Sequence, residues 1–216
     1  MNSRDTILHT VRTECAKQPH VTAPEVPVVW PLEHPAPAVM ADGFTKELVD
    51  VQGEVIRCAT MADAKRELAA LVQQNGWTSL GLLDRPIVHE ATGDLKADML
   101  HWPTPDLQPR AIEEYSASVI ATEVLLADTG TCMIECRTQP ERLLCYLPPA
   151  CVIVASVDQL AEHLQAAWPQ IAPRAAEPDR RGEFVFVTGP SRTADIEKIL
   201  ILGVHGPKRL IVLLVG

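Results

Sequence analysis

A short loop near the end of the chain gathers groups that could bind an anion. The apolar run 184–188 is followed by Gly-Pro-Ser-Arg-Thr, and an acidic segment begins two residues later. Glycine lets the backbone approach a ligand closely. Hydroxyl, guanidinium and backbone N–H groups all donate hydrogen bonds to a carboxylate or phosphate. The loop therefore predicts a site for a small anion, and its candidate ligand-binding residues are Gly189, Ser191, Arg192, Thr193 and Asp195.

The same loop is compatible with an ordinary helix start. Ser191 or Thr193 would then cap the helix, and Arg192 would pair with an acid of its first turn. Neither hydroxyl has Glu or Gln three residues later, so the reciprocal capping box is missing. Two carboxylates in that turn would repel a phosphate, and the chain has no glycine motif typical of dinucleotide or triphosphate binding. A small carboxylate is the favoured ligand, with the capping role as the open alternative.

A second cluster lies in "TEVLLADTGTCMIE", between two apolar segments. Asp128-Thr129-Gly130-Thr131 is typical of a turn in which glycine adopts a positive φ. Glu123 and Asp128 stand at the margins of strand-like runs, where a carboxylate can act as general base or nucleophile. These two are the candidate catalytic residues, and Thr129, Gly130 and Thr131 are candidate binding residues. A hairpin turn with solvated acids is the alternative.

The histidine and the thiols give weaker indications. His205, in His-Gly-Pro before the last apolar run, can hydrogen-bond a ligand or the Ser191 loop, or serve the turn alone. The six cysteines contain no Cys-x-x-Cys pair, and their spacing matches no zinc or iron–sulphur pattern. Cys132 and Cys136 fall on one face of a predicted strand. We predict free, mostly buried thiols and no metal site.

Composition limits the classes of function. The 216 residues are 47% hydrophobic and carry a formal net charge of −9, which opposes binding to nucleic acid. No apolar run approaches the roughly 18–20 residues of a membrane span. The start of the chain lacks the apolar core of a signal peptide. A cytoplasmic location is the resulting expectation.

The pattern of elements predicts an α/β fold. A helix is expected over 3–18, a proline-rich arm over 19–39, and then strands alternating with helices from residue 54. The predicted helices are 61–76 and 157–168, and 85–109 is expected to be mainly loop. The tail is interpreted as strand 184–188, helix 194–202 and a parallel strand 210–215. Continuous apolar strands indicate a mostly parallel sheet covered on both faces, in three layers.

Three segments together are similar to a known family. "GPSRTADIEKILILGVHGPKRLIVLLV", "ATEVLLADTGT" and "LLCYLPPACVIVASVDQL" resemble the lactate-utilisation protein C family, the stand-alone LUD domain. The resemblance implies a NagB/RpiA/CoA-transferase-like α/β fold. It also implies a role beside two iron–sulphur proteins that together oxidise L-lactate to pyruvate. Asp128 stands where the family often has Glu. The ferredoxin-like cysteine motifs of one partner type are absent here, so the expected iron–sulphur clusters belong to the partners and no intrinsic cofactor is expected.

Three hypotheses follow for the function. The first is a non-redox-carrying subunit of an L-lactate-oxidising system that binds a small carboxylate or organises the complex. The second is a stand-alone enzyme acting on a phosphorylated or acyl substrate. The third is a purely structural partner. The expected organisation is an N-terminal helix and arm over 1–50, followed by a LUD-type domain over 51–216.

Overall fold

The computed structural model describes residues 3–17, 29–177, 183–194, 200–202 and 206–216. The chain divides into two compact units, Met1–Pro31 and Leu32–Gly216. In the first unit, helix α1 (Ser3–Lys17) has no buried residue and agrees with the helix predicted over 3–18. The side chains of Val29 and Trp30 are exposed.

A parallel six-stranded sheet forms the centre of the second unit. The strand order is β1-β12-β7-β4-β2-β3, and each neighbouring pair is parallel. Side chains of β7 alternate between two buried cores, with Ile153 on one face and Val152 on the other. This confirms the mostly parallel sheet covered on both faces. The strands are β1 (Glu54–Cys58), β2 (Leu80–Leu82), β3 (Leu100–His101), β4 (Ala117–Ala121), β7 (Ala150–Ser156) and β12 (Arg209–Val215).

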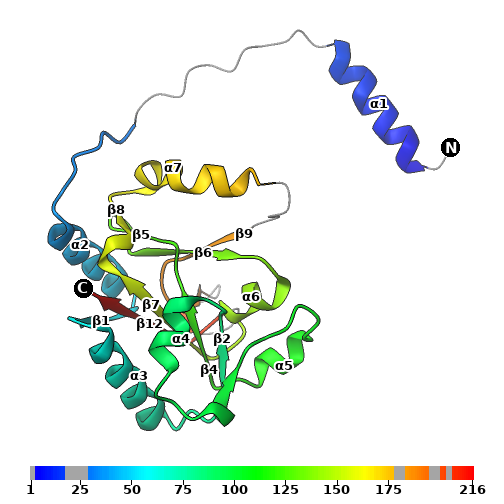
Figure 1. Ribbon diagram of the computed structural model, residues 1–216. Coiled ribbons are helices and arrows are strands. Elements are labelled where there is room, and N and C mark those ends of the chain that lie inside the picture. The colour runs from blue at the N-terminus through cyan, green and yellow to red at the C-terminus, as the bar shows by residue number, and fades with distance from the viewer. Residues whose placement is uncertain (1–2, 18–28, 178–182, 195–199, 203–205) are drawn as a thin grey trace. The chain divides into compact units, whose positions relative to one another are not determined.

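Helices α3 (Met61–Asn75) and α4 (Pro86–Thr92) cover one face of this sheet (Figure 1). Thr60 and Asp63 form a capping box at the start of α3. Gly76, the last residue of the predicted helix 61–76, ends the helix with φ 61°. The loop expected over 85–109 is wrong in part, because it contains α4, the 3₁₀ turn η1 (Ala97–Met99) and β3. Pro86 is the first residue of α4, a position that suits proline.

A second sheet lies over the opposite face of the main sheet, and α7 covers its outer side (Figure 1). Its strand order is β8-β5-β6-β9. The fold is thus three-layer α/β around the main sheet, as predicted, with α7 added beyond the second sheet. The elements of this side are α2 (Pro37–Asp50), α5 (Pro109–Glu113), β5 (Val124–Leu126), β6 (Thr131–Cys136), α6 (Gln139–Leu144), η2 (Val157–Gln159), β8 (Leu160–Ala161), α7 (Leu164–Ala175) and β9 (Glu183–Val187).

Helix α2 is an integral part of the second unit. Its side chains Ala41, Phe44 and Leu48 are buried in the core between the two sheets. Residues 1–50 were expected to form an N-terminal helix and arm, and the second compact unit begins at Leu32. The start of this helix was not predicted, because the sequence before residue 37 is rich in proline.

The helix predicted over 157–168 is displaced in the structure. Ser156 and Gln159 form a capping box around the single turn η2, and β8 then pairs with β5. Helix α7 begins only after His163, whose Nδ1 accepts a hydrogen bond from the backbone N–H of Ala166 at 3.1 Å. Two prolines lie inside α7, which explains why the sequence pattern did not predict a helix there.

The interpretation of the tail as a parallel βαβ unit is wrong. Strand β9 pairs antiparallel with β6 in the second sheet, while β12 lies in the main sheet. In place of the ends of the predicted helix, β10 (Arg192–Ala194) and β11 (Leu200–Leu202) form an antiparallel pair. β9 is the edge strand of this mixed sheet, and its side chains are partly exposed.

Candidate functional site

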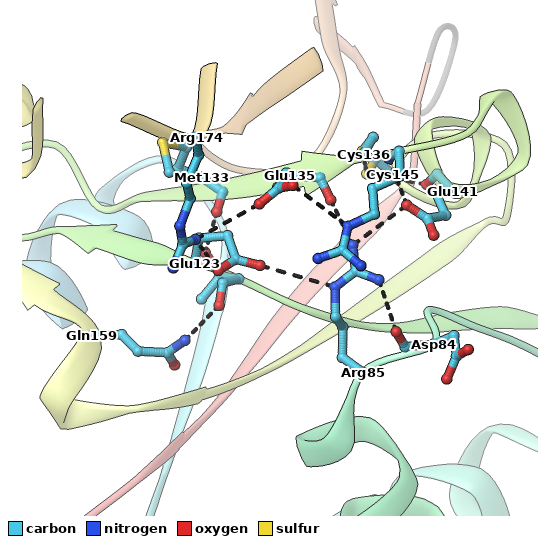
Figure 2. Close-up of polar contacts among 12 residues, drawn as sticks. Asp84, Arg85, Glu123, Met133, Glu135, Cys136, Glu141, Cys145, Gln159 and Arg174 are labelled. Carbon is cyan, nitrogen blue, oxygen red and sulfur yellow. Dashed lines mark hydrogen bonds and ion pairs between the residues drawn. The ribbon is translucent and has the colours of Figure 1, made fainter. Parts of the chain in front are cut away.

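A cluster of arginines and glutamates lies at the carboxyl ends of β2 and β4 (Figure 2). Arg85 follows β2, and Glu123 follows β4. Ligands of open parallel sheets bind at this edge of the strands. The second sheet lies beside it and contributes Glu135 from β6, while α6 contributes Glu141. We call Arg85, Glu123, Glu135, Arg137, Glu141 and Arg174 the interlayer cluster.

Two of the three guanidinium nitrogens of Arg85 have hydrogen-bond partners among the described residues. Its Nη1 donates to the carbonyl of Asp84 at 2.7 Å, and its Nη2 donates to the carbonyl of Glu135 at 3.0 Å and lies 3.4 Å from Oε2 of Glu141. The side chain is 11% exposed. Its Nε is buried without a hydrogen-bond acceptor among the described residues, and the nearest carboxylate atom is Oε1 of Glu123 at 4.0 Å. An unmade buried hydrogen bond costs about 1–3 kcal/mol.

Glu123 lies between two guanidinium groups (Figure 2). Its Oε2 accepts a hydrogen bond from Nη1 of Arg174 on α7, and its Oε1 faces Nε of Arg85. The same Arg174 nitrogen is 3.7 Å from Oε2 of Glu135. One carboxylate is thus shared by cations from two different layers of the fold.

Glu135 is a buried carboxylate, only 2% exposed, in an otherwise apolar strand. Nε of Arg137 lies 3.5 Å from its Oε1, and Arg174 approaches its Oε2. Buried charges are tolerated when they are paired and hydrogen-bonded. The interlayer cluster contains three carboxylates and three guanidinium groups, so its formal charges balance.

Backbone contacts fix the position of Glu123. Its N–H donates to the carbonyl of Met133 at 2.8 Å. The hydroxyl of Thr122 lies 2.8 Å from the carbonyls of Val124 and Met133, and the side-chain amide of Gln159 donates to the carbonyl of Thr122. The chain therefore passes from the main sheet into the second sheet at a rigid point, and Glu123 projects from it.

The structure does not bring Asp128 to this cluster. Glu123 precedes β5 and Asp128 follows it, so the two carboxylates are separated by the length of the strand. Asp128 is exposed, and its Oδ1 lies 3.2 Å from the hydroxyl of Thr129. Thr131 contacts Thr129 at 2.9 Å and Thr188 at 2.8 Å. The two predicted binding loops therefore lie side by side, apart from Glu123.

Both loop glycines approach the C-terminal end of α2. Gly130 has φ 62°, and a Cβ there would lie 2.4 Å from the backbone N of Leu48. Gly189 has φ 125°, and a Cβ there would lie 3.2 Å from the carbonyl oxygen of Val51. A helix C-terminus carries partial negative charge. Packing on α2 therefore accounts for both glycines, and their part in anion binding stays a prediction.

The remaining residues of the predicted loop site are only partly described. The backbone N–H of Ser191 donates to the carbonyl of Pro207 at 2.9 Å, which ties the loop to the start of β12. Arg192 and Thr193 are placed as the backbone of β10. Asp195 and His205 lie outside the described residues.

The sequence analysis missed most of the interlayer cluster. Arg85 had a usable signal, since it follows directly on the buried strand "LGLLD" at the expected ligand edge. Glu135 had another, because it is a lone carboxylate inside an apolar strand. Arg174 had none, because the prolines of its segment disfavour a helix.

Four buried thiols lie in the core between the two sheets. Cys132 and Cys136 lie on the same face of β6, as their spacing predicts, and they share this core with Cys145 and Cys151. The Sγ atoms of Cys136 and Cys145 are 4.0 Å apart. Burial raises the pKa of Cys151 to about 12 and raises that of Cys132 as well. Within the described residues, no group of three or more His, Cys, Asp or Glu side chains is arranged to hold a metal ion.

With this geometry established, comparison with known proteins identifies the class. The LUD domain family model matches residues 41–215, and the chain belongs to this family. It is 30% identical over 107 residues to lactate utilization protein C of Bacillus pumilus, an alignment covering 49% of this chain and 45% of that protein. With lactate utilization protein C of Deinococcus radiodurans it is 29% identical over 113 residues, 52% of each chain.

A solved structure supports the fold. A DUF162 family protein from Deinococcus radiodurans matches with a TM-score of 0.61 and 19% identity, over 86% of this chain and 100% of that one. The alignments with the curated relatives span about half of their length. None of the described helices has the length and apolar character needed to cross a lipid bilayer.

Proposed function

We propose that this chain acts in lactate utilisation, as a subunit of an iron–sulphur-dependent system that oxidises L-lactate to pyruvate. The observation that carries the proposal is membership of the LUD domain family together with relatives named lactate utilization protein C. Oxidation of a hydroxyl to a ketone releases two electrons and two protons. The electrons pass to clusters on partner proteins, because this chain offers no cysteine pattern typical of such clusters.

In this proposal the interlayer cluster binds the small carboxylate. Arg85 and Arg174 bring two guanidinium groups to the carboxyl edge of the main sheet, where ligands of such sheets bind. The Ser191 loop is the less favourable place for an anion, because its neighbouring glycine contacts the negative end of α2. That loop is instead proposed to contact the iron–sulphur subunits.

Gene deletion tests the role in lactate utilisation. The deletion strain should fail to grow on L-lactate and grow normally on glucose, and the full chain supplied in trans should restore growth. Normal growth of the deletion strain on L-lactate, in a genome without a second copy, would refute the role.

Co-purification tests the partners. An affinity-tagged chain should be colourless alone and should retain, from its native cells, proteins with the visible absorbance of iron–sulphur clusters. A tagged chain that retains no such protein from lactate-grown cells would contradict the subunit assignment.

The position of Glu123 favours one alternative, a stand-alone enzyme acting on an acyl or phosphorylated substrate. A carboxylate at the carboxyl edge of a parallel sheet can serve as base or nucleophile. Purified protein would then turn over such a substrate without partners, and Glu123→Gln would abolish turnover. Asp128→Asn is the matched control, because Asp128 is exposed and lies beyond the far end of β5. A broad substrate screen without turnover would eliminate this alternative.

A further inference from the structure

The buried Nε of Arg85 is the starting point of a more specific assignment. It is a hydrogen-bond donor without an acceptor among the described residues, and Oε1 of Glu123 lies 4.0 Å away. That separation is too long for a direct hydrogen bond. Both atoms belong to side chains that are otherwise anchored, Arg85 by three oxygen atoms and Glu123 by Arg174.

One oxygen atom can satisfy both groups at once. Placed at ordinary hydrogen-bond lengths, about 2.9 Å from Nε and about 2.7 Å from Oε1, it subtends roughly a right angle between them. This oxygen must accept a hydrogen bond from the guanidinium and donate one to the carboxylate. A water molecule does both when no ligand is bound, and a ligand hydroxyl can replace it, whereas a ketone or carboxylate oxygen only accepts.

On the other side of Glu123, Arg174 offers donors for a ligand carboxylate. Only Nη1 of Arg174 has contacts with the described residues, namely with Glu123 and Glu135. The guanidinium carries three further N–H donors, a set suited to a bidentate carboxylate. Its side chain is 40% exposed and that of Glu123 is 21% exposed, so solvent reaches both residues.

We propose that the interlayer cluster is a binding site selective for small 2-hydroxy acids. The hydroxyl of the ligand bridges Nε of Arg85 and Oε1 of Glu123, and its carboxylate pairs with the outward N–H groups of Arg174. This deepens the proposed function and rests on it for the physiological ligand. Arg85 determines the specificity. Its Nε–H group requires an acceptor, and only a hydroxyl oxygen of the ligand can accept from it and also donate to Glu123.

Discrimination between related acids follows from this arrangement. Propionate has the carboxylate without the hydroxyl, so it leaves both polar atoms unsatisfied. Pyruvate accepts from Arg85 but turns a lone pair toward Glu123. Pyruvate should bind roughly tenfold more weakly than L-lactate, the factor expected when one buried hydrogen bond is left unmade, and propionate, which makes neither, should bind at least as weakly as pyruvate.

Nuclear magnetic resonance of the arginine Nε–Hε groups in the full ¹⁵N-labelled chain is the test. L-lactate should shift the Arg85 signal saturably, pyruvate should need roughly tenfold higher concentrations, and propionate at least as high as pyruvate. Arg85→Lys identifies the signal by removing it and should weaken lactate binding, measured by calorimetry, by a similar factor. Arg66→Lys is the matched control, because Arg66 is exposed on α3 and its ion pairs with described residues are those with its helix neighbours.

The outcomes separate this site from the wider function. No saturable shift with L-lactate, or equal affinity for lactate and propionate, overturns the hydroxy-acid site even if the deletion strain fails to grow on lactate. If Arg85→Lys does not fold, the ligand series on the unaltered chain still decides the matter. Conversely, selective binding in a protein whose deletion leaves growth on lactate normal would retain the site and refute the proposed function.

Discussion

Replacing Gly130 by alanine should destabilise the protein far more than the same change at Gly76. The two glycines have almost the same backbone conformation, with φ 62° and 61°. A Cβ at Gly76 would meet nothing within 4 Å, whereas a Cβ at Gly130 would lie 2.4 Å from the backbone N and 2.8 Å from the Cα of Leu48. The pair therefore separates the cost of the backbone conformation from the cost of the close approach.

The magnitudes follow from these two contributions. A left-handed alanine costs about 1–2 kcal/mol, which is the whole expected effect of Gly76→Ala. At Gly130 the clash involves backbone atoms of α2, which cannot rotate away, and the helix is anchored by the fully buried side chains of Phe44 and Leu48. Overpacking of this kind adds roughly 1–3 kcal/mol. Gly130→Ala should therefore cost about 2–5 kcal/mol in total.

Urea unfolding of both variants, followed by circular dichroism, measures this difference. The free energies of unfolding come from linear extrapolation, and equal m values would show that the extent of unfolding is unchanged. In thermal unfolding, each kcal/mol corresponds to about 2–4 °C for a domain of this size. Equal destabilisation by the two substitutions would refute the close packing of the Asp128–Thr131 turn on α2.

Three further predictions concern local stability and the buried thiols. Thr60→Ala removes the hydroxyl that accepts from the backbone N–H of Asp63, and it should lower the free energy of unfolding in urea by about 1 kcal/mol; an unchanged value would contradict the cap. In maleimide labelling followed by peptide mass spectrometry, the exposed Cys15 should react first, while Cys132 and Cys151 react only after unfolding; equal rates in the native protein would exclude their burial. Because folding raises the pKa of Cys132 and Cys151 above the ordinary value of 9.0, stability should hold below about pH 9. It should fall as the pH rises toward the Cys151 value of about 12, by roughly 1 kcal/mol per thiol and pH unit, and a flat urea profile from pH 8 to 10 would count against this.

The main sheet was predictable because its signal is local and redundant. Runs such as "CVIVA" are apolar at every position, which only a strand buried on both faces requires, and the structure places Ile153 and Val154 in opposite cores. The second sheet gave no such signal of its own. Its strands β5 and β8 have three and two residues, and their pairing is decided by contacts between distant segments.

The interlayer cluster shows where sequence reasoning about a site ends. Glu123 was recognisable because it stands at the end of an apolar strand, where the fold class places ligands. Its partners Arg85 and Arg174 lie 38 and 51 residues away along the chain. Arg85 lies on a loop after β2, and Arg174 lies on a helix that is hard to predict because it contains two prolines. A carboxylate can be found from its own strand, but the guanidinium groups that determine its chemistry are supplied by the packing of layers.

The close approach of Gly189 has an explanation other than the anion site that its sequence suggests. Donor groups concentrated beside a glycine indicate an anion site when the preceding strand belongs to a parallel sheet. Here the preceding strand β9 belongs to the second sheet, and Gly189 approaches the carbonyl end of α2. A positive φ and a close approach have the same sequence signature whether the neighbour is a ligand or a helix end. At Gly189 the neighbour is Val51, so packing against the end of α2 accounts for this glycine, and anion binding by the loop stays a prediction.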